Sequence, residues 1–335
     1  MRRNAKILKT HTPKLFKAAV QEAAALLRRG EVVALPTETV YGLAANALDA
    51  SAVRKIFETK GRPPHNPIIV HVASLEMARA CLRRWPRAAG RLARAFWPGP
   101  LTLVLFRAPQ IPDIVTAGGP TVGVRWPSHP FIQAVIRECG FPIAAPSANP
   151  FSQLSPTTAE HVRKGLGRRI SLIVDGGPAQ VGIESTVLDL SVTPPVLLRP
   201  GMIHEEALAL VLGKLRAATK ASGQFLKSPG QLPKHYAPQA KLIVLSWQDD
   251  AHLRKQLAEL KIPPRQSHIL AHTHIPAGPF AQISVLPHEP QAFARSLYAE
   301  LHRADEAGAL HIIVEALPKG PEWKAIADRL HRAAA

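Results

Sequence analysis

Runs of apolar residues alternate with stretches of helical periodicity through the first two-thirds of the chain. Residues 13–29 carry alanine and leucine at helical spacing and end at Gly30, which predicts a helix and its stop. The apolar run 32–35 predicts a buried strand, and residues 51–60 predict a second helix. Further strands are expected at 68–72, 101–106, 122–124, 143–145, 172–174 and 186–190, and further helices at 131–139, 158–164 and 205–216. This alternation is typical of a mixed α/β domain around a twisted sheet.

The composition changes near residue 217. Residues 217–240 are rich in glycine, serine and proline, which predicts an extended linker. Strands are expected again at 242–245, 283–286 and 312–314, alternating with helices at 251–260, 291–304 and 322–334. We therefore expect a first domain over residues 1–216, a linker over 217–240, and a small three-layer α/β domain of Rossmann-like type over 241–335.

Composition and charge narrow the choice of partners. The longest apolar runs fall far short of the ~20 residues of a membrane helix, and no apolar signal-peptide core follows the basic N-terminus. We therefore expect a cytoplasmic protein without a membrane partner. The net charge of +18 favours an anionic partner, without choosing between a nucleotide and a nucleic acid. Two cysteines, Cys81 and Cys139, provide neither a disulfide framework nor a structural zinc set.

Six short polar motifs stand next to these apolar runs. They are Pro36-Thr-Glu-Thr-Val-Tyr-Gly42, Lys60-Gly-Arg-Pro-Pro-His-Asn-Pro-Ile-Ile-Val-His71, Thr121-Val-Gly-Val-Arg125, Pro146-Ser-Ala-Asn149, Gly182-Ile-Glu-Ser-Thr186 and Arg199-Pro-Gly201. A rigid sheet that presents convergent polar loops is a usual way to build a small-molecule site. The six motifs together predict an active site that handles anions.

The segment 60–71 carries most of this prediction. Lys60 and Arg62 are separated by one glycine, so both cations leave the backbone within one tight turn, and three prolines stiffen the rest of the loop. Two fixed cations beside Asn66 suit a polyphosphate, with arginine as a fork and lysine as a point charge. The alternative is a solvated basic loop, which the three prolines disfavour.

The other motifs are individually ambiguous. The chain has no P-loop and no Gly-x-Gly-x-x-Gly after a strand, so side chains and turn amides would have to hold a nucleotide. The turn 146–149 offers phosphate a hydroxyl, an amide and N–H groups, or is only a turn. Segment 182–186 admits a ligand close to its backbone, or is an ordinary hairpin. Arg125 and Arg199 can each pair with a carboxylate or phosphate, or form plain ion pairs.

Two other chemistries are disfavoured. Ser147 or Ser185 as a nucleophile would need a neighbouring base, and no Gly-x-Ser-x-Gly is present. His272 and His274 lack a third ligand at suitable spacing, so a loop is expected there rather than a metal site.

With these residues identified, the first 215 or so residues resemble the YrdC-type threonylcarbamoyl-AMP synthase family. The resemblance rests on the motifs above together with Trp97-Pro-Gly-Pro-Leu-Thr102 and His129-Pro130. Ser228-Pro-Gly and His235-Tyr-Ala-Pro238, followed by a small α/β domain, resemble the longer two-domain form. Between them stands Gln231-Leu-Pro-Lys234, where the family usually carries basic and aromatic residues. The resemblance implies a twisted mixed sheet of the YrdC type, similar to a double-stranded-RNA-binding surface.

The resemblance also implies a reaction. L-Threonine, bicarbonate or CO2, and ATP with Mg²⁺ would give threonylcarbamoyl-AMP and pyrophosphate, as in a nucleotidyltransferase. Downstream tRNA threonylcarbamoyl-transferase machinery would use this product to modify tRNA beside the anticodon. The threonine carbamate would itself attack the α-phosphorus, so no protein nucleophile is needed.

By the same resemblance, the catalytic cations would be Lys60 and Arg62. ATP would contact Arg62, Asn66, Thr121, Asn149, Thr157, Arg199 and Tyr236. L-Threonine would contact Thr39, His71, Arg125, Ser147 and Ser185. Mg²⁺ would be held by the phosphates rather than by dedicated protein ligands, and the linker would close over the site as a lid.

Two further functions stay open at this point. A non-catalytic protein that binds double-stranded RNA or tRNA would use the same surface and the +18 charge, but aromatic residues make up only 5% of the chain and form no stacking cluster. A carbamoyl-phosphate-using transferase of the same superfamily would form the adenylate from a different substrate. Direct tRNA binding is compatible with the synthase as well.

Overall fold

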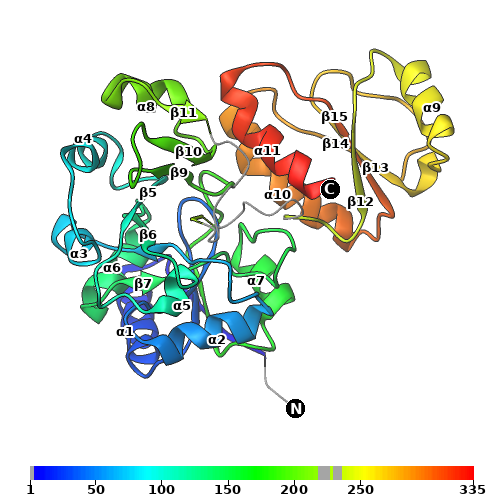
Figure 1. The fold of residues 1–335 in the computed structure, drawn as a ribbon. Coiled ribbons are helices and arrows are strands. Elements are labelled where there is room, and N and C mark those ends of the chain that lie inside the picture. The colour runs from blue at the N-terminus through cyan, green and yellow to red at the C-terminus, as the bar shows by residue number, and fades with distance from the viewer. Residues whose placement is uncertain (1–3, 218–226, 229–235) are drawn as a thin grey trace. The chain divides into compact units, whose positions relative to one another are not determined.

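The computed structural model describes residues 4–217, 227–228 and 236–335 (Figure 1). The chain divides into two compact units. The first consists of Met1–Phe151 and Ser155–Gln231, and the second of Ser152–Leu154 and Leu232–Ala335. In the part of the chain that is described, no helix is both long enough and apolar enough to cross a membrane.

The first unit is built around one mixed sheet. Its strands are β1 (Lys6–Lys9), β2 (Val33–Leu35), β3 (Gly42–Asn46), β4 (Val70–His71), β5 (Leu101–Phe106), β6 (Thr121–Arg125), β7 (Ile143–Ala144), β8 (Leu172–Asp175), β9 (Thr186–Asp189), β10 (Val196–Arg199) and β11 (Arg216–Ala217). They lie in the order β1-β8-β2-β3-β7-β4-β6-β5-β9-β10-β11. The sheet contains parallel pairs, such as β4 with β6, and antiparallel pairs, such as β5 with β6. The expected mixed, twisted sheet is therefore confirmed.

Helices cover both faces of this sheet. They are α1 (Pro13–Arg28), α2 (Ala50–Lys60), α3 (Leu75–Ala80), α4 (Arg87–Phe96), α5 (Asp113–Thr116), α6 (Pro130–Cys139), α7 (Ala159–Leu166) and α8 (Glu205–Leu212). Successive side chains of a strand point to opposite faces. In β2, Val33 and Leu35 accordingly join the core formed with α1 and α6, whereas Ala34 joins the core formed with α2, α4 and α7. Burial on both faces explains why the strands read as unbroken apolar runs.

Two expected elements are shorter in the structure than the sequence predicts. Helix α8 stops at Leu212 rather than at residue 216, because Gly213 takes φ +84° and ends it. Arg216 and Ala217 then pair with β10 as β11. The expected strand 68–72 is confined to β4, since the amide of Ile68 donates instead to the carbonyl of Val115.

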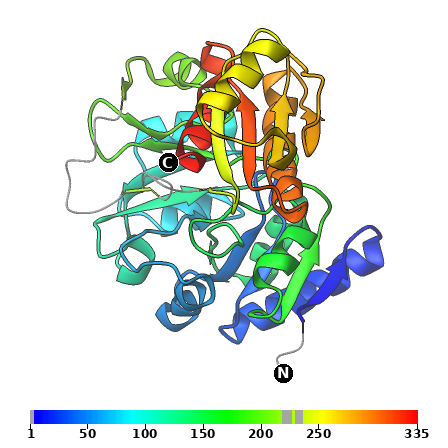
Figure 2. The ribbon, with the colours of Figure 1, turned by 90° about the vertical axis from the view of Figure 1, so that its right-hand side faces the viewer.

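The second unit is a three-layer α/β fold, as expected. Its strands are β12 (Lys241–Leu245), β13 (Ser267–Ala271), β14 (Gln282–Val285) and β15 (His311–Glu315), and its helices are α9 (Asp250–Glu259), α10 (Pro290–Glu306) and α11 (Lys324–Ala333). All strand pairs are parallel, in the order β12-β15-β13-β14. Helix α9 covers one face, and α10 and α11 cover the other (Figures 1 and 2). The linker predicted over 217–240 lies mostly outside the described residues.

Candidate active site

Arg125, the last residue of β6, is buried at the centre of a polar network in the first unit. Its Nη2 lies 2.7 Å from Oε1 of Glu38, Nη1 donates to Oγ1 of Thr39 at 2.9 Å, and Nε donates to the carbonyl of Gly99 at 3.3 Å. Burial alone would raise the pKa of the Glu38 carboxyl, but the Arg125 guanidinium and hydrogen bonds hold it below its usual range. The pair is therefore a charged ion pair inside the protein.

The loop from β2 to β3 fixes the Thr39 hydroxyl. The Thr37 hydroxyl donates to the carbonyl of Val40 at 2.6 Å and accepts the amides of Thr39 and Val40. The Oγ1 atoms of Thr37 and Thr39 are 2.9 Å apart. Because the Thr37 proton is already donated, the Thr39 hydroxyl donates to Thr37 and accepts from Arg125. Such side-chain bonds to the local backbone make this turn rigid.

A second arginine is held by the loop before β9. Arg199 donates from Nε to the carbonyl of Ser185 at 3.0 Å and from Nη2 to its hydroxyl at 3.1 Å. The Ser185 hydroxyl also lies 2.8 Å from Oγ1 of Thr102 on β5. A Cβ at Gly201 would lie 2.3 Å from the amide nitrogen of Thr186, so only glycine allows this close approach.

Backbone hydrogen bonds join these two arginine networks. The amide of Gly182 donates to the carbonyl of Thr39 at 3.1 Å, and the amide of Thr186 donates to that of Pro100 at 3.0 Å. Gly99, next to Pro100, accepts from Arg125. Motifs far apart in the sequence therefore form one connected site.

Lys60 lies in the last turn of α2 and is buried. Its Nζ donates to the carbonyl of Ser147 at 2.5 Å, to the carbonyl of Asn149, and at 3.4 Å to Oδ1 of Asn149. Burial, and secondarily the Arg62 guanidinium, lower the pKa of the Lys60 ammonium well below its usual range. In this structure Lys60 therefore fixes the Pro146–Asn149 turn.

Arg62 is bound in the same manner to the loop that follows it. Its Nε donates to the carbonyl of Asn66 at 3.1 Å, and Nη2 donates to Oδ1 of Asn66 at 2.8 Å and to the carbonyl of Pro67 at 2.7 Å. Gly61 takes φ +64°, which ends α2 and turns the chain between the two cations.

Three buried polar atoms of the predicted site lack a well-oriented hydrogen-bond partner among the described residues. They are Nδ2 of Asn66, Nδ1 of His71 and Nη2 of Arg125, whose contact with Glu38 is an ion pair. Buried polar groups are rarely left unpaired, so such atoms suggest a bound molecule. His71 stands beside Arg125 in the parallel pairing of β4 with β6. Burial, with a smaller effect of Arg125, lowers the pKa of His71 to about 3, so its imidazole is neutral at physiological pH.

This neutral histidine predicts a pH dependence of stability. The pKa of His71 is about 3 in the fold and 6.5 without it, so the unfolded chain binds more protons between these values. The contribution of the neutral His71 to the free energy of unfolding is then fully present above pH 6.5, and it is lost as the pH drops towards 3. We expect His71→Gln to remove up to about 3 kcal/mol of the stability loss between pH 7 and pH 4. Urea unfolding at both pH values measures this.

The control for this prediction is His65→Gln, because His65 is exposed on the same loop. The two variants can differ in absolute stability, but only His71→Gln should flatten the pH dependence. If the free energy of unfolding of His71→Gln falls with pH as steeply as that of the wild type, His71 is not a buried neutral imidazole.

Three further predicted residues are placed as follows. Thr121 begins β6 and Arg125 ends it, which separates them by about 13 Å. Thr157 precedes α7, and its amide and hydroxyl lie 3.3 Å from Nδ1 of His161. Tyr236 belongs to the second unit, where its buried ring packs on Tyr298 at 6.1 Å and lies under the Arg329 guanidinium.

The sequence interpretation missed four polar residues of this region. Glu38 lies within a motif that it identified, yet only Thr39 was selected there. Thr102 lies in a motif quoted only for the resemblance. The Ser155 hydroxyl donates to Oε1 of Glu184 at 2.5 Å, and both residues are buried. The sequence did offer a signal for Glu38 and Glu184, since each is a carboxylate close to apolar runs. A buried carboxylate requires a partner, so both could have been selected as site residues.

Comparisons with known proteins agree with this architecture. Residues 25–201 match the Sua5/YciO/YrdC family model, described as "Telomere recombination", and residues 203–335 match the C-terminal domain of threonylcarbamoyl-AMP synthase. The threonylcarbamoyl-AMP synthase of Pyrococcus abyssi is 40% identical over 320 residues, covering 94% of this chain and 93% of the relative. That of Bacillus subtilis is 43% identical over 325 residues, covering 94% and 92%.

Solved structures give the same result. P. abyssi Sua5 complexed with L-threonine matches with a TM-score of 0.90 and 37% identity, over 99% of this chain and 98% of that one. A variant of the same protein, with adjacent histidine and tyrosine replaced by alanine, matches with a TM-score of 0.89 and 37% identity, over 98% and 96%. A mixed sheet carrying these motifs, followed by a small parallel domain, defines an enzyme of the Sua5/YciO/YrdC class. The chain belongs to the threonylcarbamoyl-AMP synthase family, in its two-domain form.

Proposed function

We propose that this chain is a nucleotidyltransferase that makes threonylcarbamoyl-AMP and pyrophosphate from L-threonine, bicarbonate or CO2, and ATP. The observation that carries the proposal is the buried set of Arg125, Thr39, His71 and Ser185 in a chain of this family. An arginine beside hydroxyls and a neutral imidazole suits a small hydroxylated amino acid. The RNA-binding alternative gains no support from the relatives, which are named as synthases.

L-Threonine would place its carboxylate on Arg125. A guanidinium offers five donors, so Arg125 can bind a substrate carboxylate while it keeps Glu38. The hydroxyls of Thr39 and Ser185 and the unpaired Nδ1 of His71 would then bond the hydroxyl and amine of the substrate. Relevant support is that P. abyssi Sua5 has been solved with L-threonine.

ATP would be held by the remaining predicted residues of the first unit. Arg62 and Arg199 would contact phosphate oxygens, and the Nδ2 atom of Asn66 provides an unpaired donor. Lys60 would keep the 146–149 turn in place and add positive charge. Mg²⁺ would enter on the phosphates. Tyr236 stays a predicted ATP contact, and the proposed lid involves His235 and residues 231–234, which lie outside the described residues.

The chemistry then needs positioning and charge rather than a nucleophilic side chain. The threonine amine adds to CO2 and loses a proton, which gives a carbamate. A carbamate oxygen attacks the α-phosphorus, the new P–O bond forms, and the bond from the α-phosphorus to the bridging oxygen breaks. Pyrophosphate leaves with that electron pair. Fixed cations that face the developing charge are the main source of rate in such phosphoryl transfers.

Pyrophosphate release tests the proposal. We expect release only when L-threonine, bicarbonate and ATP are all present, with threonylcarbamoyl-AMP identified by mass spectrometry. Replacing threonine and bicarbonate by carbamoyl phosphate tests the third function and should give no adenylate. Tight RNA binding without any turnover would overturn the proposal in favour of an RNA-binding protein. The product, a reactive adenylate, would be consumed by a tRNA-modifying transferase, and direct contact of tRNA with this chain is a separate proposal.

A further inference from the structure

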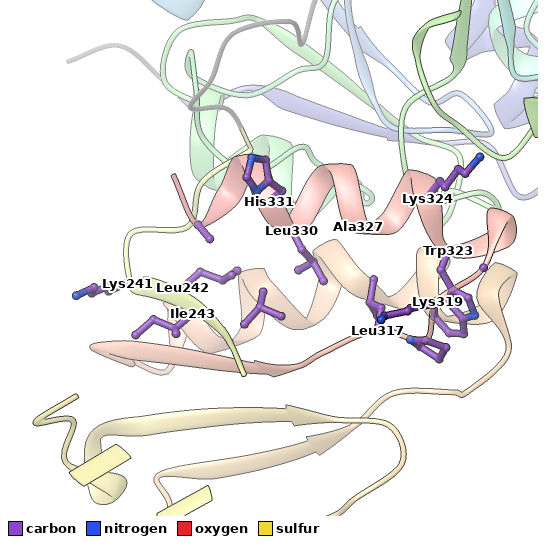
Figure 3. Close-up of a pocket in the computed structure, with 14 residues that line it drawn as sticks. Lys241, Leu242, Ile243, Leu317, Lys319, Trp323, Lys324, Ala327, Leu330 and His331 are labelled. Carbon is purple, nitrogen blue, oxygen red and sulfur yellow. The ribbon is translucent and has the colours of Figure 1, made fainter. Parts of the chain in front are cut away.

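The second unit contains a cavity of about 650 Å³ between strand β12 and helix α11 (Figure 3). Its apolar lining includes Leu242, Leu317, Trp323, Ala327 and Leu330. Small-molecule sites usually have volumes of about 300–1,000 Å³ and a mainly apolar lining. None of the residues assigned above to threonine or ATP lines this cavity, so its function is unexplained by the synthase reaction.

The position of the cavity follows from the order of the strands. Strands β12 and β15 are neighbours, yet α9 leaves β12 for one face of the sheet and α11 leaves β15 for the other (Figure 1). The loop after β15, with Leu317 and Pro318, lines the cavity. The cavity therefore runs along β12 from its first residue, Lys241, to the loop that follows β15.

The charged side chains that line this cavity have a single sign. Among the described residues, the charged or titratable side chains of the lining are Lys241, Lys319, Lys324 and His331, and none is acidic. Glu322 is close to Gly320 but does not line the cavity. Lys319 is exposed and extends over the apolar floor beside Leu317 (Figure 3). An apolar floor with a cationic rim is complementary to a molecule that has both an apolar body and an anionic group.

We propose that this cavity binds an amphipathic organic anion with an elongated apolar body and a carboxylate or phosphate head. The lining residues of β12, from Lys241 to Val244, span about 10 Å, and α11 from Lys324 to Ala333 spans about 14 Å. The body lies along β12 under α11, against Leu242 and Leu330. The head lies at Lys319. A second copy of this chain is a poor occupant, because a net charge of +18 repels the same rim.

Isothermal titration calorimetry on the full chain tests this, with decanoate, decyl phosphate and decyltrimethylammonium below their micelle concentrations. ATP and threonine are left out, so the outcome is independent of the synthase proposal. We expect one binding site for each anion, with the cation at least about tenfold weaker, since its head meets the Lys319 ammonium instead of pairing with it. The two anions distinguish a carboxylate ligand from a phosphate ligand. Equal affinity for decanoate and decyltrimethylammonium, or no binding of either anion, would overturn the proposal.

Two variants locate the site. Ala327→Trp fills the cavity from an exposed position on α11 and should weaken decanoate binding about tenfold or more. Lys319→Glu should weaken it about threefold or more, by removing a surface charge pair and adding a repulsion. Matched controls on the opposite face, Ala251→Trp and Lys255→Glu in α9, should bind as the wild type does. Unaltered binding in both Ala327→Trp and Lys319→Glu would contradict this location, and the exposed Lys319 keeps the test valid if the tryptophan variant misfolds.

Discussion

Arg125→Gln is expected to raise the KM for L-threonine by about two orders of magnitude while the KM for ATP stays within about twofold. The substitution removes the only guanidinium that lies beside Thr39 and His71 among the described residues. It also leaves the Glu38 carboxylate buried without its ion-pair partner. We therefore expect an additional loss of about 3 kcal/mol in the free energy of unfolding. Steady-state pyrophosphate release and urea unfolding measure the two effects separately.

The double variant Glu38→Gln/Arg125→Gln separates recognition from stability. Two neutral amides can pair with each other, so unfolding stability should largely return, but the KM for threonine should stay high because no guanidinium is restored. Arg107→Gln is the matched control, since the Arg107–Asp113 pair lies nearer the surface of the same unit. If the double variant regains threonine affinity together with stability, Arg125 supports the fold and does not bind substrate.

The sheet could be predicted from the sequence wherever apolar side chains mark a strand. β5 and β6 were recognised from their apolar runs, and β6 carries the predicted Arg125 at its end. β3, which reads Gly-Leu-Ala-Ala-Asn, was missed because small residues give little apolar or β-branched signal. It nevertheless lies inside the sheet, where it pairs with β2 on one side and with β7 on the other. Its stability comes from neighbouring strands, which local sequence does not reveal.

Site residues could be selected from motifs, but their partners could not. The sequence identified Arg125 and Thr39 separately. Only the structure shows that Arg125 bonds to Thr39 and forms an ion pair with Glu38. The resemblance assigns Tyr236 to ATP, and only the structure adds that its ring packs on Tyr298 and lies under the Arg329 guanidinium within the second unit. Such long-range pairing depends on strand order, and a single sequence does not encode strand order in any local pattern.

Lys60 is another residue whose hydrogen-bond partners could not be predicted from the sequence. Its replacement is the second change for which we expect a large loss of activity. The sequence presents it as a cation for phosphate, but its ammonium is bonded to carbonyls of the 146–149 turn. Lys60→Met should therefore disorder that turn and, under the proposed function, remove a charge near the phosphates. We expect the kcat for pyrophosphate release to fall about 10²- to 10³-fold, with a smaller change in the KM for ATP. Lys55→Met is the control, because Lys55 lies on the same helix in a half-exposed pair with Glu31.

The pH profile provides a second measurement on the same residue. Burial and Arg62 lower the pKa of Lys60, so the ammonium loses its proton at a lower pH than an ordinary lysine does. In the wild type, kcat/KM for ATP should accordingly decline on the alkaline side well before the usual lysine range, and Lys60→Met should lack this decline. The methionine variant keeps the length of the side chain but neither the charge nor the donors. If it retains kcat within about tenfold of the wild type, the ammonium neither holds the turn nor assists the transfer, because either role requires its hydrogen-bond donors.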